Sequence, residues 1–247
     1  HPALLRVRHG CSQRAPRRLI QSGAARPYID CRTGQRRTAV NATTHDTIFL
    51  LQRLQEYLPD LVASFAANGG GHCVVASRIA TRVLEHYGCE ATPVATAFMA
   101  FPPSWTRFIE QHGFDEIDSP AAAAHAAQNG PFVSITPIDG VHTTDTGLNY
   151  HVVVLAAGLL FDGDLGRHAR PKRGMHLPKT GLLPVPAGFS TLEQGTLLRH
   201  PSGSSLAYQS LPGVETFRSV PAWARLDRSD AAVAAVIRLI ERNYPSE

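Results

Sequence analysis

Three consecutive glycines lie just before a cysteine, and a helical pattern of apolar residues begins at that cysteine; this combination limits the folds open to the chain. Residues 69–71 are all glycine, and His72 and Cys73 follow them. Glycine adopts backbone angles that other residues avoid, so such a run can end one element and start the next abruptly. From residue 73 to 87 the apolar side chains recur at helical spacing, and Gly88 is a suitable C-terminal stop. The sequence therefore predicts that Cys73 lies in the first turn of a helix.

A cysteine in that position has the surroundings that thiol chemistry needs. The thiolate is the reactive form, and a free thiol has a pKa of about 8.5. A helix N-terminus carries roughly half a positive charge on its unpaired N–H groups, which lowers the pKa of a thiol placed there. The same N–H groups can bind the oxyanion that forms on an attacked carbonyl. The competing interpretation of Cys73 is a small buried core residue, and its position alone does not decide between the two.

A base and an acceptor that orients it come from a predicted hairpin, residues 150–155 and 159–165. Both strands are apolar on both faces, so we expect both faces to be covered. A loop at residues 156–157 places His151 opposite Asp162, whereas a loop at 157–158 places it opposite Asp164, with Cβ atoms about 5 Å apart in either case. Both aspartates point to the same face, so the alternation leaves both open. Histidine and aspartate in strands this apolar cost free energy unless they pair, which favours a His–Asp pair serving Cys73.

Three segments together resemble the transglutaminase-like and papain-like cysteine peptidase superfamily. They are Gly-Gly-Gly-His-Cys, Asn-Tyr-His-Val-Val-Val and Leu-Leu-Phe-Asp-Gly-Asp, within residues 68–171. The order Cys, His, Asp is also similar to that of arylamine N-acetyltransferases. The resemblance implies an α+β fold in which an antiparallel sheet packs against the helix that starts with the catalytic cysteine. It implies Cys73 as nucleophile and His151 as base, and the family spacing favours Asp162 over Asp164 as the orienting residue.

The sequence departs from each subfamily pattern near the cysteine. Papain-like peptidases carry an upstream Gln for the oxyanion hole; here the nearest amide is Asn68, which we expect in that place. Gly71, His72 and Asp164 are further candidates for the oxyanion site or pocket, although His72 also fits a plain loop histidine. Val74 replaces the aromatic residue that often follows the cysteine in peptidases and transglutaminases. The Arg before the glycine pair and the Glu after the Cys, expected of the acetyltransferases, are absent.

The resemblance implies thiol-dependent acyl chemistry through a thioester on Cys73. Hydrolysis of a peptide, isopeptide or amide bond is the first expectation, and acyl transfer to an amine, of transglutaminase or N-acetyltransferase type, is the second. A non-catalytic binding module of the same fold, with an inert Cys73, is the alternative from another class. The expected partner is a peptide or amide substrate. A basic run after the hairpin is typical of a solvated turn but could attract an acidic substrate if it lies near the site: Arg167, His168, Arg170, Lys172 and Arg173.

A zinc site is weaker than the thiol interpretation. The available ligands would be His72, Cys73, His151 and Asp162, of which two are adjacent in sequence and fit a tetrahedron poorly. We therefore expect no metal and no cofactor. Four cysteines without a CxxC pair suit a reducing compartment, and no run is long and apolar enough to span a bilayer. We expect a cytoplasmic protein with no membrane partner; the sequence does not set its oligomeric state.

The chain divides into two parts of different character. Residues 1–43 contain nine arginines and no hydrophobic periodicity, which predicts a basic flexible extension, and we favour a solvated tail over a nucleic-acid arm. Residues 44–247 are expected to form one transglutaminase-like catalytic domain. Besides the elements above, the pattern predicts helices over 44–65 (interrupted or restarted at Pro59), 104–112 (capped by Ser104), 119–128 and 230–243, strands over 92–101 and 132–136, and a hairpin over 206–218 that turns at Pro212 and Gly213.

Overall fold

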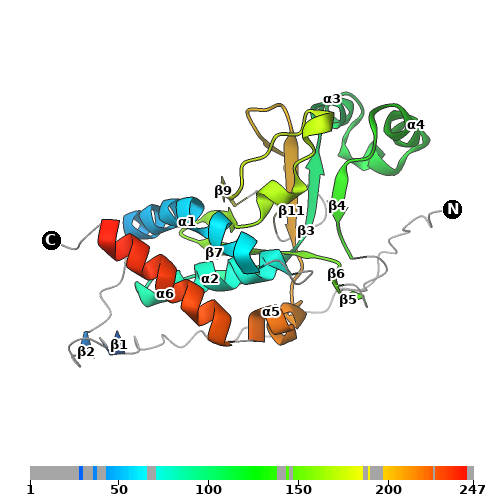
Figure 1. The fold of residues 1–247 in the computed structure, drawn as a ribbon. Coiled ribbons are helices and arrows are strands. Elements are labelled where there is room, and N and C mark those ends of the chain that lie inside the picture. Colours follow the sequence, from blue (N-terminus) through cyan, green and yellow to red (C-terminus); the bar gives the residue numbers. More distant parts are fainter. Residues whose placement is uncertain are drawn as a thin grey trace, which may run out of the picture.

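The centre of the protein is an antiparallel sheet whose middle strands are buried on both faces (Figure 1). A computed structural model describes residues 28–29, 36–37, 43–65, 71–137, 143–144, 147–185, 189, 197–224 and 226–243. The strands run in the spatial order β10 (Leu198–Arg199), β11 (Ser205–Ser210), β3 (Thr92–Phe101), β7 (His151–Ala156), β8 (Leu159–Asp162) and β9 (Gly181–Pro184), and β4 (Val133–Ile135) also pairs with β3. The chain is therefore an α+β protein with an antiparallel sheet, as the sequence predicts.

Three helices cover one face of the sheet. They are α1 (Thr44–Phe65), α2 (His72–His86) and α6 (Leu226–Asn243), which lie together in Figure 1. Their apolar stripes meet the alternate residues of β7 and β8 that point the same way, including Val154 and Phe161, in one buried cluster. The other face of the sheet is covered as well, because Val153 and Leu160 pack into a second buried cluster. The expectation that the 150–165 hairpin is covered on both sides is confirmed.

A helical insertion lies between β3 and β4 and projects from the end of β3 opposite to α1 and α6 (Figure 1). It consists of α3 (Pro103–His112), the 3₁₀ turn η2 (Phe114–Asp118) and α4 (Pro120–Asn129). Ser119 caps α4, since its Oγ accepts a hydrogen bond from the Ala122 N–H at 3.2 Å. Ser104 does not cap α3 as predicted; the helix already begins at Pro103, because proline fits the first helical position without losing a hydrogen bond.

Two further sequence predictions are wrong, one for α1 and one for the segment after residue 205. The α1 helix continues through Pro59, since Leu51, Leu54, Leu58 and Val62 on its buried stripe hold it against the core despite the missing N–H. The segment 206–218 does not form a hairpin: β11 pairs with β3 and β10, and the chain then leaves the sheet for the 3₁₀ turn η5 (Thr216–Ser219) and the short helix α5 (Pro221–Ala224). The apolar residues after β11 recur every three positions, which suits successive turns rather than a strand: Leu211, Val214, Phe217 and Val220.

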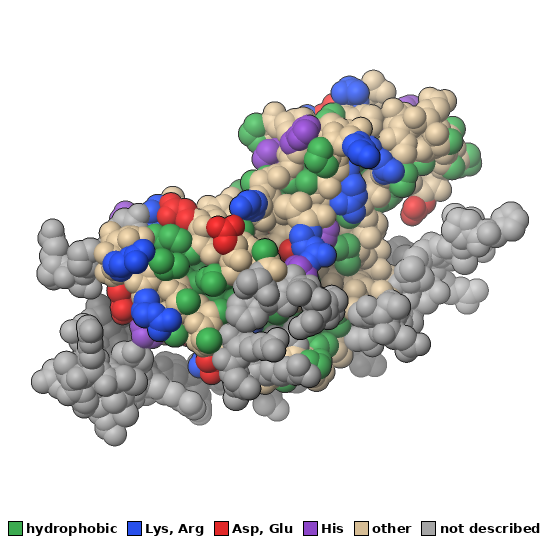
Figure 2. Space-filling model, in the orientation of Figure 1, with side chains coloured by type: hydrophobic (Ala, Val, Ile, Leu, Met, Phe, Trp, Pro, Cys, Tyr) green, Lys and Arg blue, Asp and Glu red, His purple; other side chains and the backbone are tan. Residues whose placement is uncertain are grey.

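The remaining described elements are short. Two strand pairs stand apart from the main sheet: β1 (Tyr28–Ile29) with β2 (Arg36–Arg37), and β5 (Thr143–Thr144) with β6 (Gly147–Leu148). The predicted flexible extension over residues 1–43 otherwise lies outside the described residues. Figure 2 shows acidic and basic side chains interspersed on the described part of one face. None of the helices in the described ranges is both long and apolar enough to cross a membrane.

Candidate active site

The site is built first from the N-terminus of α2, where Cys73 is the second residue. Gly71 precedes the helix with a left-handed backbone (φ 86°), a conformation that glycine adopts without a steric cost. The first helical hydrogen bond runs from the Val75 N–H to the Gly71 carbonyl at 2.9 Å. The N–H groups of Cys73 and Val74 precede that bond, so they lie outside the hydrogen-bond ladder of α2. The Cys73 thiol is free and partly exposed, and the prediction that it lies in the first helical turn is confirmed.

The helix is tied directly to the strand that carries His151. The Ser77 hydroxyl of α2 donates to the Val152 carbonyl of β7 at 2.9 Å, and both groups are buried. On the other side, Thr96 of β3 donates to the His151 carbonyl at 3.3 Å and is its register partner. These anchors bring the Cys73 side chain into hydrogen-bonding contact with the His151 ring. The sulfur and the imidazole, 78 residues apart in the chain, are therefore neighbours.

Asp162 provides the second contact of the His151 ring. His151 Nε2 lies 2.9 Å from Asp162 Oδ2 in a short ion pair that is not aligned as a standard hydrogen bond, and both side chains are buried. With Nε2 engaged by the carboxylate, Nδ1 is the ring nitrogen left for the thiol. Cys73, His151 and Asp162 thus form one connected chain of side chains.

The hairpin register differs from the one that would put Asp162 directly opposite His151. The turn lies at Ala157 and Gly158, both with positive φ, and the ladder pairs Val154 with Phe161 before it stops. Extended by three residues, this register would set Asp164 opposite His151. Asp162 instead reaches His151 diagonally, a separation that a histidine and an aspartate can bridge.

A turn built by Asp162 itself explains why the ladder stops. Asp162 Oδ1 accepts a hydrogen bond from the Asp164 N–H at 2.9 Å, the pattern of an Asx turn, which ends β8 at this residue. Gly163 lies between them and packs closely on the helices, because a Cβ added there would lie 2.7 Å from Ala76 Cβ and 2.9 Å from Leu58 Cδ2. The turn therefore fixes Asp162 and keeps the following aspartate out of direct contact with the His151 ring.

His151 and Asp162 each stabilise the charged form of the other. Burial opposes a charged His151 ring, but the Asp162 carboxylate and the contact with Cys73 outweigh it and raise the pKa of His151 well above its ordinary value. Burial likewise opposes ionisation of Asp162, yet His151, the Asp164 N–H and the Tyr208 hydroxyl lower its pKa. Near neutral pH the site thus favours an imidazolium held by a carboxylate, the form that can stand beside a thiolate.

Two aromatic residues that the sequence analysis did not single out line this pair. The Tyr208 hydroxyl of β11 donates to Asp162 Oδ2 at 2.8 Å. The Phe98 ring of β3 lies 5.1 Å from the His151 ring and 5.0 Å from the Tyr208 ring, measured between centroids. Nothing in the strand pattern marks either as functional, since both positions read as ordinary inward-facing aromatic residues.

His168, expected within a solvated basic turn, instead packs into the site. Its ring meets His151 edge to face at 5.2 Å and Phe98 at 4.8 Å. Burial and the positive charge of His151 lower the pKa of His168 to about 4. At neutral pH the second imidazole is therefore uncharged, and the charge is confined to the ring that faces Asp162.

The other basic residues of that run are exposed. Arg170 and Arg173 donate to backbone carbonyls of Arg167, Ala169 and Pro131, so part of their role is to close the surrounding turns. Arg167 is close enough to Asp164 to affect its titration. Burial raises the pKa of Asp164 to about 7, Asp162 adds to the rise, and His151 and Arg167 oppose it.

Cys73 also packs against an apolar cluster. The buried residues of this cluster include Tyr150 and Phe217, and partly exposed Leu211 and Trp223 pack against it as well. The Tyr150 hydroxyl lies 2.8 Å from Thr216 Oγ1, which fixes the η5 turn against this cluster. The surroundings of Cys73 therefore combine the ionisable His151 ring with apolar side chains.

The remaining predicted site residues have different outcomes. Asn68 lies outside the described residues. Gly71 and His72 are at the start of α2 as expected, and His72 is partly exposed. Asp164 lies beside Asp162 but contacts it through its backbone. Over the described ranges, no three His, Cys, Asp or Glu side chains converge in an arrangement that could hold a metal ion.

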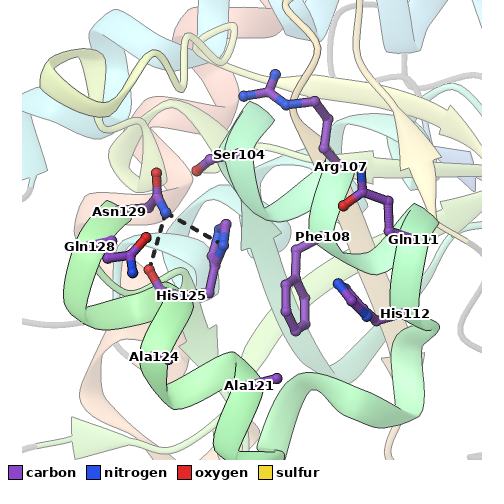
Figure 3. A pocket seen from close by; sticks show the side chains of 10 residues that line it. All are labelled: Ser104, Arg107, Phe108, Gln111, His112, Ala121, Ala124, His125, Gln128 and Asn129. Atoms are coloured by element: carbon purple, nitrogen blue, oxygen red, sulfur yellow. Dashed lines mark hydrogen bonds between the residues drawn. The ribbon is translucent and has the colours of Figure 1, made fainter.

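A cleft of about 430 Å³ lies between α3 and α4 (Figure 3). The Phe108 and His125 rings face each other at its centre, 5.0 Å apart. The Asn129 amide lies 3.4 Å from His125 Nδ1 and donates to the His125 carbonyl at 3.2 Å. Burial of the ring and the positive charges of Arg107 and His112 lower the pKa of His125. This cleft has no thiol and no carboxylate in its lining, so its chemistry differs from that of the Cys73 site.

Comparisons with known proteins assign this chain to no family. No model of a known family matches the chain, and no curated protein matches it either. One solved structure, described as "The crystal structure of genomics APC5867", is similar over 77% of this chain and 78% of its own, with 16% sequence identity and a TM-score of 0.45. A likeness this distant carries no argument about fold or activity.

Proposed function

We propose that this protein is a cysteine-nucleophile enzyme with a papain-like, transglutaminase-like core. Its reaction is acyl chemistry through a thioester on Cys73, with hydrolysis of a peptide, isopeptide or amide bond as the first choice. The observation that carries the proposal is the chain of contacts from partly exposed Cys73 to buried His151, and from His151 to buried Asp162. A nucleophile, a base and a group that orients the base are the parts that such chemistry requires.

The steps follow from the positions of these groups. His151 already holds the Cys73 proton as an imidazolium, so the thiolate Sγ attacks the carbonyl carbon, and the carbonyl oxygen becomes an oxyanion beside the N–H groups of Cys73 and Val74. When the C–N bond breaks, the imidazolium gives its proton to the departing amine and a thioester remains. Water then attacks the thioester, His151 takes a proton from that water, and the Cys73 thiolate leaves as the C–S bond breaks, which releases the acid and restores the ion pair. Asp162 stays ionised throughout and stabilises the imidazolium.

The test is the pH dependence of alkylation at Cys73 by iodoacetamide, followed by mass spectrometry of the Cys73 peptide. A free thiol with a pKa of about 8.5 is roughly 0.3% thiolate at pH 6. We expect Cys73 to react at pH 6 at no less than about a tenth of its maximal rate, because the imidazolium stabilises the thiolate. Cys89 is the internal reference, since it is buried and burial raises its pKa. A profile for Cys73 like that of an ordinary thiol would favour the non-catalytic binding module.

A second measurement separates the two enzymatic alternatives. Incubation with p-nitrophenyl acetate should acetylate Cys73, and Cys73→Ala should show no such adduct while keeping its thermal midpoint. If the enzyme is a hydrolase, the acetyl group leaves at a rate that added amines do not change. If acylation occurs but an added amine speeds its loss and becomes acetylated, the protein is an acyltransferase.

A further inference from the structure

The Tyr208 hydroxyl has a contact that a core tyrosine does not need for packing alone. It donates to Asp162 Oδ2 at 2.8 Å, the same oxygen that lies 2.9 Å from His151 Nε2. Both Tyr208 and Asp162 are buried. A buried hydroxyl and a buried carboxylate each carry a large desolvation cost unless they are hydrogen-bonded, so neither group can lose this contact without penalty.

The contact crosses the interior of the curled sheet. Tyr208 lies on β11 and Asp162 on β8, and β3 and β7 separate these strands in the sheet order. Strands are about 4.8 Å apart, so a flat sheet would keep the two residues roughly 14 Å apart, beyond the reach of the two side chains. The curvature brings them together above Phe98, the register partner of Tyr208. The hydrogen bond thus joins a late strand of the chain to the Asp162 end of the hairpin.

Both oxygens of the Asp162 carboxylate are held. Oδ1 accepts the Asp164 N–H and Oδ2 accepts the Tyr208 hydroxyl, so the group cannot rotate about its terminal bond without losing both. We propose that Tyr208 is a positioning residue, whose hydroxyl keeps the Asp162 carboxylate turned toward His151. The inference depends on the proposed function only where it treats the His151–Asp162 pair as catalytic.

The test is a titration of the His151 ring by NMR in wild type and in Tyr208→Phe. Phenylalanine keeps the ring packing on Phe98 but removes the donor, so the Asp162 carboxylate can turn away from His151 and stabilises the imidazolium less. We expect the pKa of His151 to fall by about one pH unit, roughly what the loss of a hydrogen bond to a charged group is worth. The rate of Cys73 alkylation at pH 6 should fall about tenfold with it, while the rate at pH 9.5 changes less than twofold.

The matched control is Ser205→Ala, which removes a buried hydroxyl from the same strand. Ser205 Oγ accepts from Thr106 Oγ1 at 3.1 Å and has no contact with Asp162 among the hydrogen bonds of the described residues. This variant should leave the His151 titration unchanged even if it lowers the thermal midpoint. An unchanged His151 titration in folded Tyr208→Phe would overturn the positioning role, whatever the wild-type thiol does. Ordinary thiol reactivity in wild type, with the His151 shift present, would instead overturn the proposed function alone.

If Tyr208→Phe does not fold, 3-fluorotyrosine at position 208 provides the reverse test. Fluorine makes the phenol a stronger donor and leaves the hydroxyl in place. The pKa of His151 should then rise and Cys73 should become more reactive at pH 6. A shift in the opposite direction, or none, would contradict the proposal.

Discussion

His151 and His125 each pack against a phenylalanine ring, but their pKa values shift in opposite directions. Each ring lies about 5 Å from a phenylalanine ring, Phe98 for His151 and Phe108 for His125. His151 is the more deeply buried, and burial alone would lower its pKa further than that of His125. The pKa of His151 is nevertheless raised, and that of His125 is lowered.

The residue beside each ring accounts for the difference. His151 has the Asp162 carboxylate 2.9 Å from Nε2, whereas His125 has the Asn129 amide 3.4 Å from Nδ1. Aspartate and asparagine are nearly equal in shape, so the two sites differ chiefly by one negative charge. Arg107 and His112 add positive charge near His125 and make a second cation less favourable. The charge of the partner, rather than burial, therefore decides whether these two histidines hold a proton at neutral pH.

Asp162→Asn tests this difference most strongly, because it replaces the carboxylate beside His151 with an amide like the one beside His125. Without the carboxylate, only the contact with Cys73 opposes burial, and burial is the largest effect on the ring, so the pKa of His151 should fall below 6.5. We expect turnover of an activated ester, or alkylation at pH 6, to fall about 10³-fold or more, as when the orienting aspartate of a triad is replaced. The measurement is the rate at Cys73 between pH 5 and 9.

Asp164→Asn is the matched control for this prediction. Asp164 touches Asp162 through its backbone N–H, which the substitution keeps, so the reactivity of Cys73 should change less than about fivefold. A larger loss in Asp164→Asn than in Asp162→Asn would show that the wrong carboxylate has been assigned to His151.

Much of this site could be predicted from the sequence, because its main parts are local. The glycine run and the helical spacing after it place Cys73, and the polar residues of two apolar predicted strands mark His151 in one strand and Asp162 and Asp164 in the other. The choice between Asp162 and Asp164 could not come from alternation, since both share a face; it depends on an Asx turn that stops the ladder early.

The sequence did not reveal Tyr208 and His168 as residues of the site, because their contacts depend on tertiary structure. Tyr208 is 46 residues from Asp162 and meets it only because the sheet curls. His168 is surrounded by basic residues in the sequence, and its burial follows from the 3₁₀ turn η3 (Leu165–His168) that folds it over Phe98. In both cases the deciding contact is non-local, so no pattern of spacing could reveal it.

The Asp164 carboxyl offers an intermediate test, because it is buried near charges of both signs. Its pKa is about 7 in the folded protein and 3.8 ordinarily, so between these pH values the unfolded chain releases a proton that the folded protein keeps. This group therefore contributes stability that is lost as the pH rises from about 4 to 7. Each pH unit of that window is worth about 1.4 kcal/mol, which sets an upper bound of roughly 4 kcal/mol.

Asp164→Asn should remove this pH dependence. Compared with wild type, the variant should gain about 2–4 kcal/mol in free energy of unfolding at pH 8 relative to pH 4.5, measured by urea denaturation at both values. The comparison within each protein cancels any constant effect of the amide. Equal differences at the two pH values would mean that Asp164 ionises in the folded state as it does in water.

The smallest change in pKa is expected when His125 receives a carboxylate partner like that of His151. In Asn129→Asp a carboxylate replaces the amide near His125 Nδ1, so the pKa of His125 should rise by about one pH unit, as measured by NMR. The rise should be smaller than the effect of Asp162 on His151, because Asn129 is exposed and water screens its charge. It should also shrink in 1 M salt, where screening acts over only about 3 Å. Ala127→Asp, on the same helix but outside the lining of the cleft, is the control and should shift His125 less. If the two variants shift His125 equally, general charge explains the change, and the contact with the ring does not decide the protonation of this histidine.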